Sequence, residues 1–168
     1  MTQIEPRIAQ QQEFGEPDAP ATSWADGERR LEAAELYWIT TVRPDGRPHV
    51  TPLIGVWVDG RWCFCTGATE RKAHNLEQNR HCAVTTGDNA LHGGLDVVLE
   101  GVAERVEDRP TLQRLADAYV AKYGDEWRFG VGDGVFTHES GEALVFAVPP
   151  TTVFAFGKGP YSQTRFSF

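Results

Sequence analysis

The feature that most constrains this chain is a series of short period-two segments, separated by tight-turn signals, that begins at residue 37. Residues 37–42 (YWITTV) are aromatic and β-branched, as residues in strands commonly are. Residues 43–46 (RPDG) place proline and glycine where a β-turn needs them, and 47–58 (RPHVTPLIGVWV) alternate as a second strand. Asp59-Gly60 predicts a hairpin turn into a third strand over 61–66. Strands joined by such short turns are antiparallel.

The rest of the chain continues this pattern and adds a few helices. Further strands are predicted over 81–87, 95–106, 143–148 and 151–156, and helices over 24–34, 69–78 and from Asp108 to Gly124. Antiparallel strands with peripheral helices favour a mainly β fold built as a closed or half-closed β-barrel. The glycine-rich segment 124–141 is predicted to be a flexible loop that can serve as a lid.

The length of 168 residues fits one domain. Residues 1–22 are rich in Gln, Glu, Pro and Asp, so they are expected to form a flexible N-terminal arm, with the folded domain over 23–168. The chain holds five tryptophans, a number that calls for an explanation by packing or by ligand stacking.

Charge and hydropathy exclude several classes of protein. The net charge is −8 and no run of Lys and Arg exceeds two residues, so no nucleic-acid partner is expected. No apolar run approaches the roughly 20 residues of a membrane span. The first 20 residues lack a basic start followed by an apolar stretch, so no secretory signal is visible and a cytoplasmic protein is expected.

Cysteine and histidine spacing argues against disulfides and metal. The cysteines are Cys63, Cys65 and Cys82, an odd number without the spacing of a zinc clip, and are expected to be small buried residues in a reducing compartment. No histidine has a partner at metal-binding helical spacing, so no metal site is expected.

The segment 64–72 (FCTGATERK) is the most informative for chemistry. A strand ends, a Gly turn follows, and a helix begins with Arg71 and Lys72 in its first turn. The helix dipole favours acids at that place, so two cations there conflict with it. A bound phosphate resolves the conflict, held by backbone N–H groups, both cations and the hydroxyl of Thr66 or Thr69. The alternative is that Glu70 balances the charge and both basic side chains are simply solvated.

The second candidate feature is one face of the strand 47–58. Val50, Ile54, Val56 and Val58 form a predicted core face, and the opposite face is mixed. That mixed face can stack a flat ring against Trp57 and Leu53, with clearance at Gly55 and hydrogen bonds from Thr51. The alternative is a barrel face packed by a neighbouring helix. Pro52 indicates an edge strand or a bulge.

In these segments the sequence resembles the pyridoxamine 5′-phosphate oxidase-like family of split β-barrels. Residues 38–52 (WITTVRPDGRPHVTP) resemble its opening hairpin, and 64–77 (FCTGATERKAHNLE) resemble its cofactor-phosphate segment. Residues 163–166 (QTRF) resemble the closing segment of members that use FMN or the deazaflavin coenzyme F-420.

The resemblance implies a split β-barrel of the FMN-binding type, a homodimer, and two cofactor sites at the subunit interface. A dimer interface and a ring-binding cleft would also account for the many tryptophans. The resemblance places Thr66, Arg71 and Lys72 on the phosphate, Thr51, Pro52 and Leu53 beside the ring, and Arg165 near the cofactor or substrate. Trp57, from the mixed strand face, or Arg165 is expected to shape the pocket. The family's pyridoxamine phosphate oxidases carry Arg and Lys on the strand that here reads TPLIGV, so vitamin B6 oxidation is not expected.

The predicted function is an FMN-binding oxidoreductase that transfers hydride between the cofactor ring and a small-molecule substrate. The ring performs this chemistry, so no catalytic acid or base is assigned. The alternatives are a reductase that uses coenzyme F-420, or a non-enzymatic flavin- or haem-binding stress or sensor protein. In a haem version, His49, His74 or His92 would be the candidate axial ligand.

Overall fold

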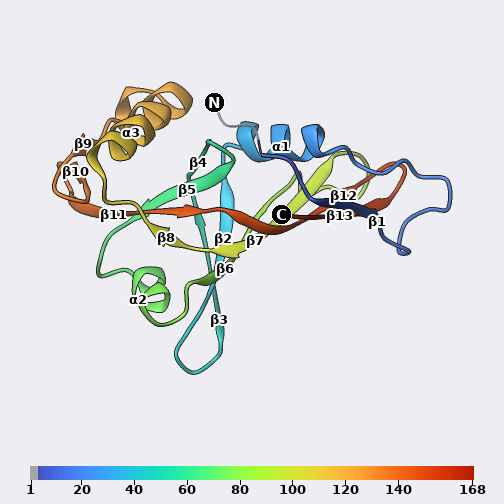
Figure 1. The fold of residues 1–168 in the computed structure, drawn as a ribbon, viewed down its shortest axis with the longest axis horizontal. Helices are drawn as coiled ribbons and strands as arrows, with labels where there is room; N and C mark the ends of the chain where they lie inside the picture. Colours follow the sequence, from blue (N-terminus) through green and yellow to red (C-terminus); the bar gives the residue numbers. More distant parts are fainter. Residues whose placement is uncertain (1–3) are drawn as a thin grey trace.

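A computed structural model describes residues 4–168 of the chain as two antiparallel sheets with helices around them (Figure 1). The larger sheet has the order β1-β13-β12-β7-β6-β2-β3; the smaller has β4-β5-β11-β10-β9, with β8 pairing β11. The strands are β1 (Ile8–Gln11), β2 (Tyr37–Val42), β3 (Pro48–Leu53), β4 (Val56–Val58), β5 (Arg61–Thr66), β6 (His81–Thr86), β7 (Leu95–Val102), β8 (Glu104–Arg105), β9 (Gly130–Val131), β10 (Phe136–His138), β11 (Gly141–Val148), β12 (Pro150–Gly157) and β13 (Ser162–Ser167). The predicted mainly β, split-barrel class is confirmed.

Three α-helices surround the sheets: α1 (Trp24–Ala33), α2 (Arg71–Gln78) and α3 (Arg109–Tyr123), with a 3₁₀ turn η1 (Asp125–Trp127) after the last. In Figure 1, α1 and α3 lie above the sheets and α2 lies below them, beside the β2–β3 hairpin. Within residues 4–168, no helix is long and apolar enough to cross a bilayer.

The predicted strand over 47–58 is in fact two strands in different sheets. β3 ends at Leu53 on the edge of the larger sheet, and β4 begins at Val56 on the edge of the smaller one. The expectation that Val50 shares a core face with Val56 is therefore wrong, because Val50 is 54% exposed whereas Val56 is 2% exposed. The change of sheet between the two strands breaks the alternation that the sequence pattern assumed.

The predicted loop over 124–141 is also corrected. It contains η1 and the short strands β9 and β10, which extend the smaller sheet beyond β11. The β9–β10 turn is tied down by Arg105, whose Nη2 donates to the carbonyl of Gly134 at 3.1 Å. Strands of two and three residues are too short to show alternation in sequence, and the surrounding glycines favoured the prediction of a loop.

The described part of the predicted arm, residues 4–22, runs beside the C-terminal strand. Within it, β1 pairs with β13, and the Thr22 amide donates to the Thr164 hydroxyl at 3.0 Å. Residues 1–3 of that arm lie outside the described residues. The flexibility of the arm stays a prediction.

Two separate cores account for part of the tryptophan content. The first core includes Trp24 and Trp62, which are 7% and 0% exposed. The second core lies under α3 and is centred on Tyr119 and Phe136. Trp38 and Trp127 remain 48% and 38% exposed, so one chain does not bury all of its tryptophans.

A polar network joins α3 to the segment between β3 and β4, where the chain crosses from the larger sheet to the smaller one. Lys122 Nζ donates to the Tyr37 hydroxyl at 2.8 Å and to the Gly55 carbonyl at 3.1 Å, and it lies 4.9 Å from the centroid of the Tyr37 ring. The Tyr123 hydroxyl donates to the same Gly55 carbonyl at 2.8 Å. Burial lowers the pKa of Lys122 from its ordinary value to about 8, with slight opposition from Glu32.

We expect the unfolding free energy of a Lys122→Met variant to rise less with pH than that of the unsubstituted protein. The lysine pKa is about 8 in the folded protein and about 10.4 in the unfolded chain. The unfolded chain therefore binds more protons between these values, and Lys122 makes stability rise with pH there. Partial solvation limits that rise to about 1–2 kcal/mol.

The measurement is urea unfolding of both proteins from neutral pH to about pH 10.5. The difference between the two curves isolates Lys122, since Tyr37 and the buried cysteines titrate in both proteins. Parallel curves across this range would contradict the assignment.

Candidate phosphate site

The candidate site begins at the turn between β5 and α2. Thr66 ends β5, and the chain turns through Gly67 to Glu70, the N-cap of α2. No side chain caps this helix, and its first turn holds no acid. Instead, Glu70 accepts a hydrogen bond from the Gly67 amide at 2.9 Å and pairs with the Lys72 ammonium. The predicted clash between cations and the helix dipole is thus present in the structure.

Two of the predicted phosphate residues are buried and the third is exposed. Thr66 is 3% exposed and Lys72 is 6% exposed, whereas Arg71 projects from the surface. Burial of Glu70 opposes its ionisation, but hydrogen bonds from Lys72 and from the Gly67 amide outweigh this and lower its pKa. Glu70 is therefore ionised at neutral pH, and its carboxylate pairs with the buried Lys72 side chain under the helix start.

The structure adds Arg43 and His49 to this place. Burial lowers the pKa of His49, and the positive charges of Arg43, Lys72 and Arg71 lower it further. Arg43 follows β2 and His49 lies on β3, so three elements bring basic groups together. We call Arg43, His49, Arg71 and Lys72 the basic cluster. Among residues 4–168, neither Arg43 nor Arg71 forms an ion pair.

Asn75 fixes α2 against the hairpin. Its side chain is fully buried, and its Nδ2 donates to the Thr41 hydroxyl on β2 at 2.9 Å. Thr41 lies directly opposite His49 in the β2–β3 register. Both the Oδ1 of Asn75 and the Nδ1 of His49 are buried, and neither has a hydrogen-bond partner among residues 4–168.

Comparison with known proteins agrees with this architecture. The sequence profile of the family described as pyridoxamine 5′-phosphate oxidase matches residues 26–155. The chain belongs to the pyridoxamine 5′-phosphate oxidase-like family. The match includes β2, β3, β5 and α2, which carry the basic cluster. Comparison with curated protein sequences gives no match.

Solved structures show the same fold at low sequence identity. A conserved hypothetical protein of Mycobacterium tuberculosis aligns with TM-score 0.67 and 21% identity, over 82% of this chain and 86% of its own. An FAD-binding protein of Mesorhizobium loti aligns with TM-score 0.59 and 20% identity, over 88% and 96%. A haem-binding protein of Mycobacterium smegmatis aligns with TM-score 0.67 and 16% identity, over 87% of this chain and 59% of its own.

Three of the residues that the family resemblance implied share a strand with His49. Thr51, Pro52 and Leu53 lie on β3, the strand that carries His49. Thr51 shares its face of the strand with His49, since residues two apart point the same way. The Thr51 hydroxyl donates to the Pro52 carbonyl at 3.1 Å.

Trp57 lies elsewhere in this family member. Its Nε1 donates to a Glu28 carboxylate oxygen on α1 at 3.1 Å, and its ring lies 6.3 Å from that of Trp24. Trp57 also lines a groove of about 550 Å³ with α3 residues that include Arg114 and Lys122. That groove does not include Thr66, Arg71 or Lys72. The ring-stacking role of Trp57 stays a prediction.

Arg165 is also apart from the basic cluster within one chain. It is exposed on β13, opposite Phe154 of β12. In the larger sheet, β12, β7, β6 and β2 lie between β13 and β3. Four strands therefore separate Arg165 from β3 within one chain.

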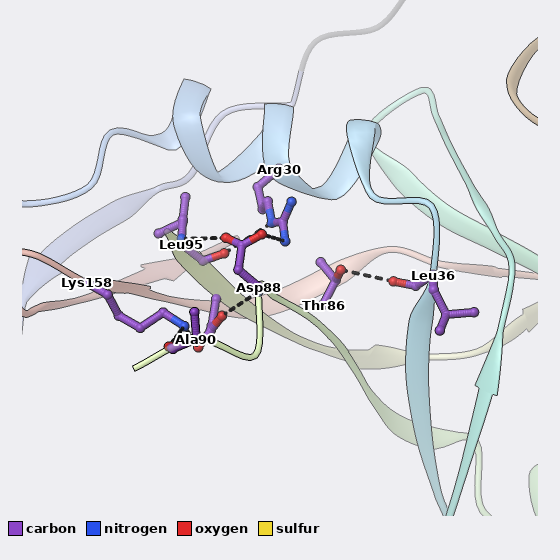
Figure 2. Close-up of polar contacts among 8 residues, drawn as sticks. Arg30, Leu36, Thr86, Asp88, Ala90, Leu95 and Lys158 are labelled. Carbon is purple, nitrogen blue, oxygen red and sulfur yellow. Dashed lines mark hydrogen bonds and ion pairs between the residues drawn. The ribbon is translucent and has the colours of Figure 1, made fainter. Parts of the chain in front are cut away.

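A second group of charges, near α1, is fully paired. Figure 2 shows Arg30, whose guanidinium donates to Asp88 at 2.8 Å and to the Leu95 carbonyl at 3.1 Å. Lys158 pairs with Asp96 at 2.9 Å and donates to the Ala90 carbonyl at 2.6 Å. These contacts hold the segment between β6 and β7 in place. They leave no unmatched charge on Arg30 or Lys158 to attract an anion.

Histidines and cysteines add little to the site apart from His49. His74 is exposed on α2, and His92 shares a 3.0 Å hydrogen bond with the Tyr161 hydroxyl. Within residues 4–168, no three His, Cys, Asp or Glu side chains gather in a metal-binding arrangement. The predicted absence of a metal site stays a prediction.

We expect Glu70→Gln to destabilise the protein while strengthening anion binding. The change leaves the buried Lys72 ammonium without its carboxylate, at a cost of about 1–2 kcal/mol, because Glu70 is only half-buried. It also raises the net positive charge of the basic cluster. Urea unfolding measures the loss, and the rise in melting temperature with added phosphate measures the binding.

The matched control is Glu77→Gln on the same helix, where the side chain is 66% exposed. Such a surface change alters stability by less than about 0.5 kcal/mol. Equal effects of the two changes on stability and on phosphate binding would contradict the role assigned to the Glu70–Lys72 pair.

Proposed function

We propose that this protein is an FMN-binding oxidoreductase that transfers hydride between the flavin ring and a small-molecule substrate. The observation that carries the proposal is the basic cluster. Two guanidinium groups that form no ion pair within residues 4–168 and one buried lysine all act on His49 near the start of α2, in a chain with a net charge of −8. Unmatched positive charge of this kind favours a phosphate group as ligand.

The residues present fit a flavin phosphate. Arg71 and Lys72 supply charge, and the hydroxyl of Thr66 lies at the end of β5 for a hydrogen bond. The strand segment Thr51–Leu53 runs from the basic cluster toward the first core and offers a backbone edge to a planar ring. The hydride chemistry is supplied by the flavin ring when it is bound. The protein's part is to bind and orient the ring and to exclude water.

We further propose that two copies of the chain form the working unit, with a cofactor site at each end of their interface. The outer face of the larger sheet supports this, since it leaves Leu36, Trp38 and Val50 48%, 48% and 54% exposed. A cavity of about 540 Å³ on that face is lined by Trp38, Val98 and Phe156 among others. Arg165, on the same sheet, would then reach the site of the other copy.

Two alternatives follow from the same site. Coenzyme F-420 also presents a phosphate, so it is the first alternative cofactor. The second is a non-enzymatic flavin- or haem-binding protein, which the fold similarity to a haem-binding protein of Mycobacterium smegmatis favours. An absorbance spectrum of the purified protein separates flavin, deazaflavin and haem, and turnover of reduced cofactor separates an enzyme from a carrier.

We expect FMN to stabilise the protein and Arg71→Ala to weaken that effect. At a ligand concentration 100 times Kd, binding adds about 2.7 kcal/mol, which raises the melting temperature by roughly 5–10 °C. Removing a guanidinium–phosphate contact costs about 1.5–3 kcal/mol, so Kd rises roughly 10- to 100-fold. Thermal unfolding across an FMN titration measures both.

The matched control is Arg47→Ala, because Arg47 is an exposed arginine of the β2–β3 turn that already pairs with Asp45 at 2.8 Å. It should leave the FMN affinity within about twofold. The proposal fails if neither FMN nor coenzyme F-420 changes the melting temperature of the unsubstituted protein.

We expect Trp38→Glu to separate the two copies. Placing a carboxylate in a desolvated apolar interface is costly, so the dimer should dissociate at micromolar concentration. Sedimentation velocity measures the change in mass. Trp127→Glu, at a tryptophan that is 38% exposed on η1, is the control and should leave the dimer intact. An unsubstituted protein that sediments as a monomer would contradict the dimer directly.

A further inference from the structure

His49 occupies an unusual place at the edge of the candidate phosphate site. It lies on β3 directly opposite Thr41, and Thr41 is held by Asn75 from α2. The Nδ1 of His49 is buried and has no partner, although the ring as a whole is only part-buried. Nε2 is therefore the nitrogen left to meet a ligand from solvent.

The charged groups that face His49 are almost all positive. Arg43 faces it from the end of β2, and Arg71 and Lys72 face it from α2. Lys72 forms an ion pair with Glu70, and Asp45 in the β2–β3 turn forms an ion pair with Arg47. Among the described residues, no carboxylate acts to raise the pKa of His49. The imidazole is therefore neutral at pH 7 in the ligand-free protein.

Two unsatisfied atoms in this neighbourhood have complementary chemistry. Four buried side-chain atoms of the described chain have no hydrogen-bond partner, and two of them belong to His49 and Asn75, on either side of Thr41. Asn75 Oδ1 can only accept a hydrogen bond, and a protonated imidazole donates from both nitrogens. Protonation of His49 would thus supply a buried donor near a buried acceptor, either directly or through a water.

We propose that His49 is a further contact for the bound anion and takes up a proton when the anion binds. A dianion seated among Arg43, Arg71 and Lys72 cancels the positive field that keeps the imidazole neutral. The imidazolium then donates from Nε2 to the anion, and its buried Nδ1–H becomes a donor on the strand position opposite Thr41, the residue to which Asn75 is bonded. This role rests on the proposed phosphate site and adds a proton to its binding equilibrium.

The sign of the pH effect follows from linkage. Anion binding raises the pKa of His49, so the bound protein holds more protons than the free protein between the two pKa values. Affinity for the anion therefore increases as pH falls through that window, by up to about tenfold per pH unit. A phosphate monoester titrates near pH 6 and obscures this effect. Sulfate stays a dianion throughout and is the suitable probe.

The experiment titrates the histidine ring protons of the full-length protein by NMR from about pH 5 to 8, in sodium sulfate and in sodium chloride of equal ionic strength. A His49→Gln variant assigns the His49 resonance. We expect the pKa of His49 to lie below about 6.5 in chloride and to rise by at least half a unit in sulfate. His81, exposed at the start of β6, is the internal control, and its resonance should behave in the same way in both salts.

Thermal unfolding of the same samples separates the possible failures. If sulfate raises the melting temperature but leaves the pKa of His49 unchanged, the role of His49 is overturned and the phosphate site stands. If neither sulfate nor FMN raises the melting temperature, the phosphate site itself is overturned. His49→Gln should still bind sulfate, more weakly and with no pH dependence above about pH 6. Should that variant not fold, His49→Asn and the shift in the unsubstituted protein carry the same test.

Discussion

The architecture depends on a close approach at Gly55, where the chain leaves one sheet and enters the other. A Cβ at this position would lie 2.6 Å from the indole of Trp62, so only glycine fits without displacing the core. Its amide and carbonyl groups are both bonded to the end of α3, through Tyr123 and Lys122. The crossing is thus fixed from inside by an aromatic ring and from outside by a helix. Because the chain leaves the larger sheet here, β3 is an edge strand of that sheet. The β2–β3 hairpin can therefore lie beside α2.

The two clusters of charge in the protein differ in how they are balanced. Around α1, Arg30 and Lys158 each have a carboxylate and a carbonyl as partners, so they serve to order a loop. Around α2, the cations outnumber the acids, and the first helical turn adds its own positive end. The same residue types therefore stabilise the structure around α1 and favour binding of an anion around α2.

Much of this could be predicted from the sequence where local chemistry decides the structure. The N-caps Ser23 and Asp108 accept the amide hydrogen bonds that the helix-start pattern predicts, and Gly124 ends α3. The conflict of Arg71 and Lys72 with the helix dipole is also local and is present in the structure, whereas the anion site inferred from it stays a prediction. Long-range effects were missed: the division of 47–58 into two strands depends on Trp62, and the membership of Arg43 and His49 in the basic cluster depends on how α2 packs against the hairpin through Asn75. From the sequence, His49 was a candidate only as an axial ligand of a haem, because nothing local links it to Arg71 and Lys72.

The two edges of the larger sheet are protected in different ways. One edge is occupied by β1, which comes from the N-terminal arm and pairs with β13. The other edge is β3, in which Pro48 and Pro52 lack the amide hydrogen that a further strand would need. A second chain therefore has no ready ladder to extend at β3, which also guards the protein against edge-to-edge aggregation. The larger sheet therefore offers a second chain its faces rather than its edges, and on a face shape and side-chain chemistry select the partner.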